Sequence, residues 1–263
     1  KYNFSIIEIH NRPNYINQIR RKAPDLTLSL YFHNDPLSMD GSKTIKDRKF
    51  LLKNCYKIIF NSNWSKKRFL EGMENKFINS DKLSIFYQSA KKGSLSLIKN
   101  KKRWITFVGK LNKAKGYDIF CKAIVDVLNM NKSWRAKVIG DEKRENLELN
   151  HNNADILGFK KHHEVINIFK KSSIAVVCSR WEEPFGRTSL EASSRGCATI
   201  ISNKGGLIET TDNAIILNKL DELNLYQNLK KLIKNSRFRK SLQKLGRKNV
   251  KHSIKKNTKI IDQ

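Results

Sequence analysis

The chain has 263 residues, which is enough to bury one large hydrophobic core or two modest ones. It carries 53 lysine and arginine residues against 24 aspartate and glutamate residues, a formal net charge of +29. No apolar run reaches the length of about 18 residues that a transmembrane helix needs, and no helix-turn-helix, RNA-recognition or zinc-finger pattern accompanies the charge, so we expect no specific nucleic-acid partner.

The excess of positive charge has two interpretations. It can attract nucleic acid or an anionic membrane surface. It can also reflect mutational bias, because lysines number 39 and arginines only 14, and asparagine and isoleucine are abundant, as in an AT-rich genome. We attribute more than half of the excess to this bias.

Nine segments are expected to form strands and five to form helices, in an alternating order that predicts an α/β fold with parallel sheets. The predicted strands are Phe4–Ile9, Leu26–Phe32, Lys57–Asn61, Leu83–Phe86, Trp104–Val108, Ala136–Ile139, Asp155–Leu157, Ile174–Cys178 and Thr199–Ser202. The predicted helices are Ser65–Glu71, Tyr117–Met130, His163–Lys171, Thr188–Ser194 and Leu220–Lys234.

The basic segment Lys91–Arg103 is weakly periodic and is the expected linker between two domains. We therefore predict a partial Rossmann-like domain over residues 1–92 and a complete one over residues 93–263. Residues 223–261 contain no acidic residue but thirteen lysines and arginines. This segment predicts a terminal pair of basic helices, whose charged faces are either simply solvated or rest on anionic lipid.

The four cysteines show no C-x-x-C spacing, and each lies in or beside an apolar segment: Cys55, Cys121, Cys178 and Cys197. We expect four reduced and mostly buried thiols in a cytosolic protein, and no zinc site.

The segment FVGKLNKAKG, residues 107–116, follows one predicted strand and precedes a predicted helix. Gly109 allows a ligand to approach the backbone closely, and Lys110 and Lys115 supply positive charge. By itself such a segment can simply be a basic, exposed turn.

A second strand-turn-helix segment reads EPFGRTSLEA, residues 183–192. Pro184 keeps Glu183 out of the helical conformation, whereas Glu191 falls in the second turn of the following helix. Between the two carboxylates, Gly186, Arg187 and Thr188 form a helix N-terminus with free N–H groups, which favours an anion. An anion site beside two carboxylates that can bind hydroxyl groups suits a nucleotide-diphosphate sugar.

These two segments make the chain similar to glycosyltransferase family 4 (group 1), whose members have an E-x7-E motif and two Rossmann-like domains that face each other across a cleft, the GT-B type. The resemblance implies a retaining, metal-independent hexosyltransferase that uses no cofactor besides its donor. In it Glu183 contacts the transferred sugar as a catalytic residue, and Glu191 binds the ribose. Gly109, Lys110 and Lys115, together with residues 186–188, bind the diphosphate; the family usually has arginine where this chain has Lys110.

The resemblance also implies roles for single residues elsewhere. His10, at the end of the first predicted strand, is expected to lie in the cleft near the donor sugar as a further catalytic residue. Gly158, Phe159 and Lys160 are expected on the side of the nucleotide base. His162 and His163 are read as an N-cap region and not as metal ligands. The family usually has more residues before this point, so we expect a fragment that lacks the start of its N-terminal domain.

The function expected from this resemblance is transfer of a sugar to a glycan or lipid-linked acceptor in surface polysaccharide or lipopolysaccharide synthesis. We expect it in the cytoplasm or at the inner face of the membrane, which the basic C-terminal helices contact. The alternatives are a non-catalytic module that binds a nucleotide sugar, a sugar-nucleotide epimerase of the same fold, and a nucleic-acid binder driven by charge.

Overall fold

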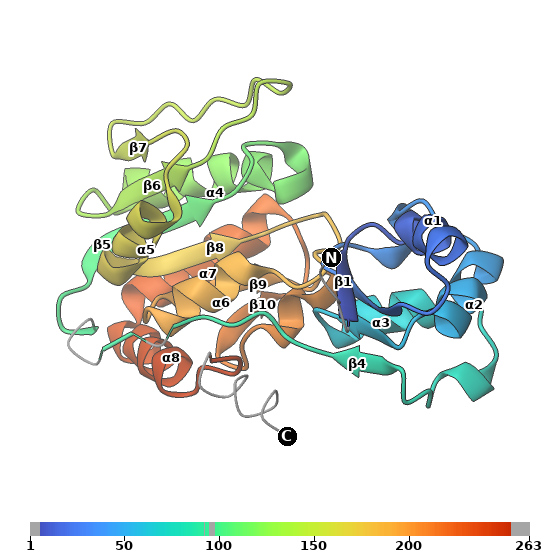
Figure 1. The fold of residues 1–263 in the computed structure, drawn as a ribbon. Coiled ribbons are helices and arrows are strands. Elements are labelled where there is room, and N and C mark those ends of the chain that lie inside the picture. The colour runs from blue at the N-terminus through green and yellow to red at the C-terminus, as the bar shows by residue number, and fades with distance from the viewer. Residues whose placement is uncertain (1–5, 92, 95–97, 254–263) are drawn as a thin grey trace. The chain divides into compact units, whose positions relative to one another are not determined.

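The computed structural model describes residues 6–91, 93–94 and 98–253. The chain forms two compact units: Lys1–Gln88 with Glu183–Phe185, and Ser89–Glu182 with Gly186–Gln263 (Figure 1). The sequence placed the boundary between residues 92 and 93, and it assigned residues 183–185 to the second domain. In the structure those three residues belong to the first unit.

The first unit is built on a four-stranded sheet of order β1-β2-β3-β4, in which all neighbouring strands are parallel. Its strands are β1 (Ile6–His10), β2 (Thr27–Phe32), β3 (Lys57–Phe60) and β4 (Leu83–Ile85). Its helices are α1 (Asn14–Lys22), α2 (Ile45–Asn54) and α3 (Asn63–Leu70). The core contains stacked aromatic rings of Phe32 and Phe60, with Phe69 tilted against both.

The second unit is built on a six-stranded parallel sheet of order β10-β9-β8-β5-β6-β7. Its strands are β5 (Lys102–Val108), β6 (Arg135–Ile139), β7 (Ala154–Ile156), β8 (Ser172–Val177), β9 (Ala198–Ser202) and β10 (Ala214–Leu217). Its helices are α4 (Tyr117–Met130), α5 (His162–Lys171), α6 (Arg187–Ser194), α7 (Glu222–Lys234) and α8 (Ser236–Lys248). Counted along this unit the order is 3-2-1-4-5-6, which is that of a Rossmann fold.

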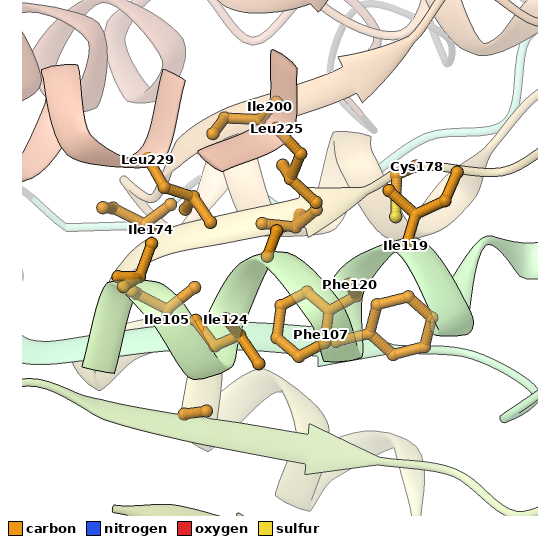
Figure 2. Close-up of a cluster of buried hydrophobic side chains, with 14 of the residues drawn as sticks. Ile105, Phe107, Ile119, Phe120, Ile124, Ile174, Cys178, Ile200, Leu225 and Leu229 are labelled. Atoms are coloured by element: carbon orange, nitrogen blue, oxygen red, sulfur yellow. The ribbon is translucent and has the colours of Figure 1, made fainter. Parts of the chain in front are cut away.

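The two faces of this sheet are covered by different helices (Figure 1). On one face α4 and α7 pack against the strands, and Figure 2 shows Phe120 and Ile124 of α4 and Leu225 and Leu229 of α7 within one buried cluster. On the other face lie α5, α6 and α8. Because both faces are covered, strand β8 is buried along its whole length, and it is apolar from Ile174 onward.

All nine predicted strands and all five predicted helices are present, and their ends agree within two residues where the structure describes them. The sequence did not predict α1, α2 or β10. Helix α1 is short and mostly polar, and Ile16 is the one of its nine residues that is buried. Strand β10 has four residues at the sheet edge, of which only Leu217 is buried.

The sheet order changes direction between β5 and β8, and the turns that follow these two strands contact each other directly. The Ala114 carbonyl accepts hydrogen bonds from the backbone N–H groups of Arg180 (2.9 Å) and Trp181 (3.0 Å). Gly116 has a φ of +72°, and a Cβ placed there would lie 1.9 Å from the Cys178 carbonyl oxygen. No side chain fits at Gly116, so glycine lets the two turns meet.

All four cysteines are free and buried, as the sequence predicted. Burial raises the pKa of Cys55 and Cys178 to about 12 and that of Cys121 to about 11. The pKa of Cys197 is also raised by burial, although the nearby Lys101 ammonium opposes the shift. Because the thiolate is the reactive form, these thiols are protected both by their pKa and by their inaccessibility.

We therefore expect the folded protein not to react with a thiol reagent such as dithionitrobenzoate at pH 8, and to release four equivalents of thiol once unfolded in guanidinium chloride. Absorbance of the released chromophore measures both. Rapid reaction of any thiol before unfolding would contradict this burial.

Replacing Gly116 by alanine should strongly destabilise the second unit, because the new Cβ meets backbone and the left-handed conformation is strained. We expect a loss of about 3 kcal/mol or more in the free energy of unfolding. Gly158 is the matched control: its φ is +63°, yet nothing lies within 4 Å of an added Cβ. Gly158→Ala should lose only about 1 kcal/mol. Urea denaturation of both variants measures the difference, and equal losses would show that the contact with Cys178 does not matter.

Candidate functional site

Three glycines bring together the turns at the carboxyl ends of β5, β6 and β7. The N–H of Gly109 donates to the Ile139 carbonyl (3.0 Å), and the N–H of Gly140 donates to the Gly158 carbonyl (3.0 Å). A Cβ on Gly140 would lie 1.8 Å from the Gly109 carbonyl oxygen, so the two turns are in backbone contact. Such close approach requires glycine at position 140, and it lies at the carboxyl edge of the sheet, where ligands of open α/β sheets bind.

A hollow of about 270 Å³ lies at this edge. It is lined by Val108, Gly109, Lys110, Ile139, Gly140, Asp141, Phe159, Lys160 and Val165. The structure thus brings two predicted diphosphate-binding residues, Gly109 and Lys110, together with two predicted base-side residues, Phe159 and Lys160. The ring of Phe159 is 75% exposed and can stack on a planar group. Gly158 does not line the hollow, but its carbonyl supports it.

The basic turn after β5 is held in place by Glu142 and Glu145, which lie in the segment after β6. The sequence did not predict a role for either residue. The Asn112 side chain accepts a hydrogen bond from the Lys115 N–H (3.0 Å) and donates one to Glu142 (3.0 Å). Glu145 accepts from the N–H of Lys113 (2.9 Å). Hydrogen bonds from Arg144 lower the pKa of Glu142 to about 2, so this carboxylate is ionised. The positions of Lys110 and Lys115 therefore depend on the segment after β6.

The N-terminus of α6 has the geometry of an anion site. Gly186 precedes the helix with a φ of +92°, and a Cβ there would lie 2.4 Å from the Leu207 side chain. Because its N-cap residue is glycine, this end of the helix has no side-chain cap within the part of the chain that the structure describes. The N–H groups of its first residues, Arg187 and Thr188, can therefore bind an anion.

Glu191 of α6 is a buried carboxylate, 7% exposed, whose Oε1 accepts two hydrogen bonds. One comes from Nε2 of His162 (2.9 Å) on the neighbouring helix α5, and the other from Nε of Arg187 (2.6 Å). Arg187, expected to contact the diphosphate, is thus an ion-pair partner of Glu191 in this structure. The sequence missed the role of His162: Lys161 is the residue before the helix, and His162 begins it and faces Glu191.

The first unit places His10, at the carboxyl end of β1, in a cluster of stacked rings. Nδ1 of His10 lies 2.8 Å from Nε2 of His33, and its ring stacks on Tyr31 with 4.7 Å between centroids. Asn11, with a φ of +54°, accepts a hydrogen bond from the His33 N–H (2.8 Å), and Asn61 donates one to the His33 carbonyl (2.8 Å). Burial, aided by His10, lowers the pKa of His33. One of the two facing ring nitrogens donates the hydrogen bond to the other, so the tautomers of His10 and His33 are coupled.

Glu183 lies in the three-residue segment that belongs to the first unit. The next residue, Pro184, accepts hydrogen bonds at its carbonyl from the hydroxyl groups of Ser62 and Ser65. The following ring, Phe185, is 2% exposed and lies 5.9 Å from the ring of Tyr87. Glu183 is therefore held by the first unit, together with His10, whereas the other predicted site residues belong to the second unit.

Within the described residues, no three histidine, cysteine, aspartate or glutamate side chains are grouped so that they could hold a metal ion. None of the helices in this part of the chain is long and apolar enough to cross a membrane.

Solved structures similar to this chain include HepE of Anabaena in complex with UDP and glucose, at 15% identity and a TM-score of 0.78, covering 98% of this chain and 77% of HepE. Sucrose-phosphate synthase of Thermosynechococcus elongatus is similar at 14% identity and a TM-score of 0.77, covering 100% of this chain and 73% of that one. These likenesses show a fold of the GT-B type.

Among curated proteins, spore coat protein SA of Bacillus subtilis (strain 168) is 23% identical over 285 residues, covering 97% of this chain and 75% of that protein. An uncharacterized glycosyltransferase of Methanocaldococcus jannaschii is 29% identical over 208 residues, covering 76% of this chain and 56% of that protein. The family model of the glycosyl transferases group 1 matches residues 89–249, which is more than half of the chain and begins where the second unit begins. The chain therefore belongs to the group 1 glycosyl transferases.

Proposed function

We propose that this chain is the transferring part of a retaining, metal-independent glycosyltransferase, which moves a hexose from a nucleotide-diphosphate sugar to a glycan or lipid-linked acceptor. The observation that carries the proposal is the set of groups at the carboxyl edge of the six-stranded sheet. There the basic turn after β5, the uncapped N-terminus of α6 and the buried carboxylate of Glu191 all belong to one unit. Phosphate, ribose and base each find a suitable partner at such an edge.

The leaving group of the reaction is a nucleoside diphosphate, whose developing charge must be stabilised. Lys110, Lys115 and the N–H groups at the start of α6 would supply this stabilisation without a metal ion. Lysine in place of the usual arginine at position 110 keeps the charge but loses the bidentate fork, so the contact there is a single point charge.

Glu191 would accept hydrogen bonds from the ribose hydroxyl groups. His162 and Arg187 both contact its Oε1, and within the described residues Oε2 makes no further hydrogen bond. Glu183 and His10 would act on the transferred sugar: the carboxylate holds hydroxyl groups and stabilises positive charge at the reacting carbon, and the imidazole holds or moves a proton. Retention of configuration would follow from attack on the face that the leaving group vacates.

The relatives support surface polysaccharide synthesis as the process. One is named a spore coat protein, and another is an uncharacterized 42.6 kDa protein in the cps region of Klebsiella pneumoniae, 27% identical over 166 residues. HepE structures contain UDP or UDP-glucose, which makes uridine nucleotides the first donors to test. The second candidate function is a module that binds the nucleotide sugar without transferring it.

Glu191→Ala should weaken the binding of the preferred nucleoside diphosphate by about 10- to 100-fold, since a hydrogen bond to a charged group contributes about 1.5–3 kcal/mol. Calorimetry with UDP, GDP, ADP and CMP on the wild type and the variant measures this. The fold should survive, because His162 and Arg187 are exposed enough to hydrate once the carboxylate is gone. Glu148→Ala, an exposed carboxylate of the same unit, is the matched control.

Equal nucleotide binding by the wild type and Glu191→Ala would show that Glu191 does not contact the nucleotide. If the wild type binds a nucleotide sugar but neither hydrolyses nor transfers it, the non-catalytic module is the better description. Binding that falls steeply with salt for any polyanion, unaffected by the Glu191 change, would instead indicate a nucleic-acid binder.

We also propose that the basic C-terminal helices bring the protein to an anionic membrane, where a lipid-linked acceptor would lie. Along α8 the exposed cations Arg237, Lys240, Lys244 and Lys248 recur at helical spacing and share one face, and Leu245 beside them is 41% exposed. No acidic residue occurs in α8 to offset this charge.

Neutralising two of these cations, in the variant Lys240→Gln/Lys244→Gln, should weaken binding to vesicles by roughly 30-fold, because each cation near an anionic surface contributes about 1 kcal/mol. Co-sedimentation with vesicles of phosphatidylcholine and phosphatidylglycerol in equal parts measures it. Lys132→Gln/Lys143→Gln removes the same charge elsewhere in this unit and should bind like the wild type. Equal binding to pure phosphatidylcholine would contradict the electrostatic contact.

A further inference from the structure

A second hollow, of about 280 Å³, lies within the first unit and contains none of the residues assigned to the donor. It is lined by Pro13, Asn14, Asn17, Gly41, Lys46, Asp47 and Phe50. These residues belong to the starts of α1 and α2 and to the loop before α2, so the hollow lies at the edge where β1 and β2 end. Ligands of open α/β sheets bind at this edge.

The walls of the hollow are fixed by local contacts. Gly41 has a φ of +89°, and a Cβ there would lie 2.6 Å from the backbone nitrogen of Asn14, so the loop before α2 touches the first residue of α1. The Asp47 carboxylate accepts a hydrogen bond from the Thr44 N–H, and the Thr44 hydroxyl accepts one from the Asp47 N–H, both at 3.1 Å. This reciprocal pair fixes the side chain of Asp47 at the rim.

The polar groups around the hollow suit a ligand that both donates and accepts hydrogen bonds. Asn14 and Asn17 are exposed and lie one turn apart on α1, hence on one face. Neither side-chain amide forms a hydrogen bond within the described part of the chain. An amide offers two donors and an acceptor, and the carboxylate of Asp47 offers further acceptors. Hydroxyl groups match this set because each can donate and accept.

The charges and the aromatic ring further restrict the class of ligand that fits the hollow. Lys46 and Asp47 are adjacent and opposite in sign, so the site favours neither an anion such as a phosphate group nor a cation. Phe50, one turn after both, is 37% exposed and lines the hollow. A lipid chain would cover this ring but would leave the two amides unpaired. A sugar ring satisfies both, since it has an apolar face and a rim of hydroxyl groups.

We propose that this hollow binds one sugar ring of the acceptor, which stacks on Phe50 while Asn14, Asn17 and Asp47 hydrogen-bond its hydroxyl groups. The inference rests on the proposed function, because a glycosyltransferase has to hold an acceptor sugar apart from its donor. It assigns the recognition of the acceptor to α1 and α2, the two helices that the sequence did not predict.

The test uses the methyl glycosides of glucose, galactose, mannose and N-acetylglucosamine as probes. Saturation-transfer NMR should detect binding of at least one of them to the wild type, with the strongest transfer to protons on one face of the ring. Phe50→Ala and Asn17→Ala should each weaken that binding at least three-fold. Tyr56→Ala, which removes another exposed aromatic ring of this unit, and Gln18→Ala, the helix neighbour of Asn17, should bind like the wild type.

Absence of transfer from every glycoside, or transfer that persists unchanged in Phe50→Ala, would overturn the proposal. Circular dichroism checks that each variant is folded. Nucleotide binding measured on the same samples separates this inference from the proposed function: nucleotide binding that depends on Glu191, without any sugar binding, overturns only the acceptor site. Sugar binding that depends on Phe50, without nucleotide binding, supports the hollow as a sugar site and overturns the donor assignment.

Discussion

The arrangement of the second unit depends on one close contact, that of Gly116 with the carbonyl of Cys178. Strands β5 and β8 are hydrogen-bonded neighbours at the point where the sheet order changes direction, and the turns that follow them meet at the carboxyl edge of the sheet. Besides the hydrogen bonds to Ala114, the guanidinium of Arg180 pairs with Asp118 at 2.5 Å and 2.8 Å, which fixes the start of α4 to the turn after β8. The turn after β5 and the turn after β8 are thus held together by backbone contacts and by an ion pair.

Glu191 is a buried carboxylate that two neighbouring side chains hold in place. The carboxylate is removed from water, yet it is held by one cation on its own helix and by an imidazole on the next. Both partners are themselves exposed, so the pair sits at the border between core and solvent. A carboxylate placed in this way points in a fixed direction, because both partners contact its Oε1.

Most of the strands and helices, and the two turns of the candidate site, could be predicted from the sequence because they depend on local patterns. A continuous apolar run followed by proline and glycine predicted β8 and the start of α6. The glycines of residues 107–116 predicted the turn after β5. What could not be read depends on contacts between distant segments. His162 meets Glu191 only because α5 and α6 pack side by side, and the hydroxyl of Ser62 reaches a carbonyl 122 residues away, which moves Glu183 into the first unit. Strand β10 was missed because its short edge position leaves only one residue fully buried.

The hydrogen bond from the Ser62 hydroxyl to the Pro184 carbonyl also determines how the polypeptide can be divided. The chain passes between the units three times, after residues 88, 182 and 185, so no single cut yields two intact pieces. A piece that begins at Ser89 would still carry Pro184 and Phe185 but would lack the serine hydroxyls and the Tyr87 ring that cover them, leaving an aromatic side chain exposed to water. Each unit therefore has its own sheet and its own core, but the first unit is complete only with residues 183–185 from the middle of the second.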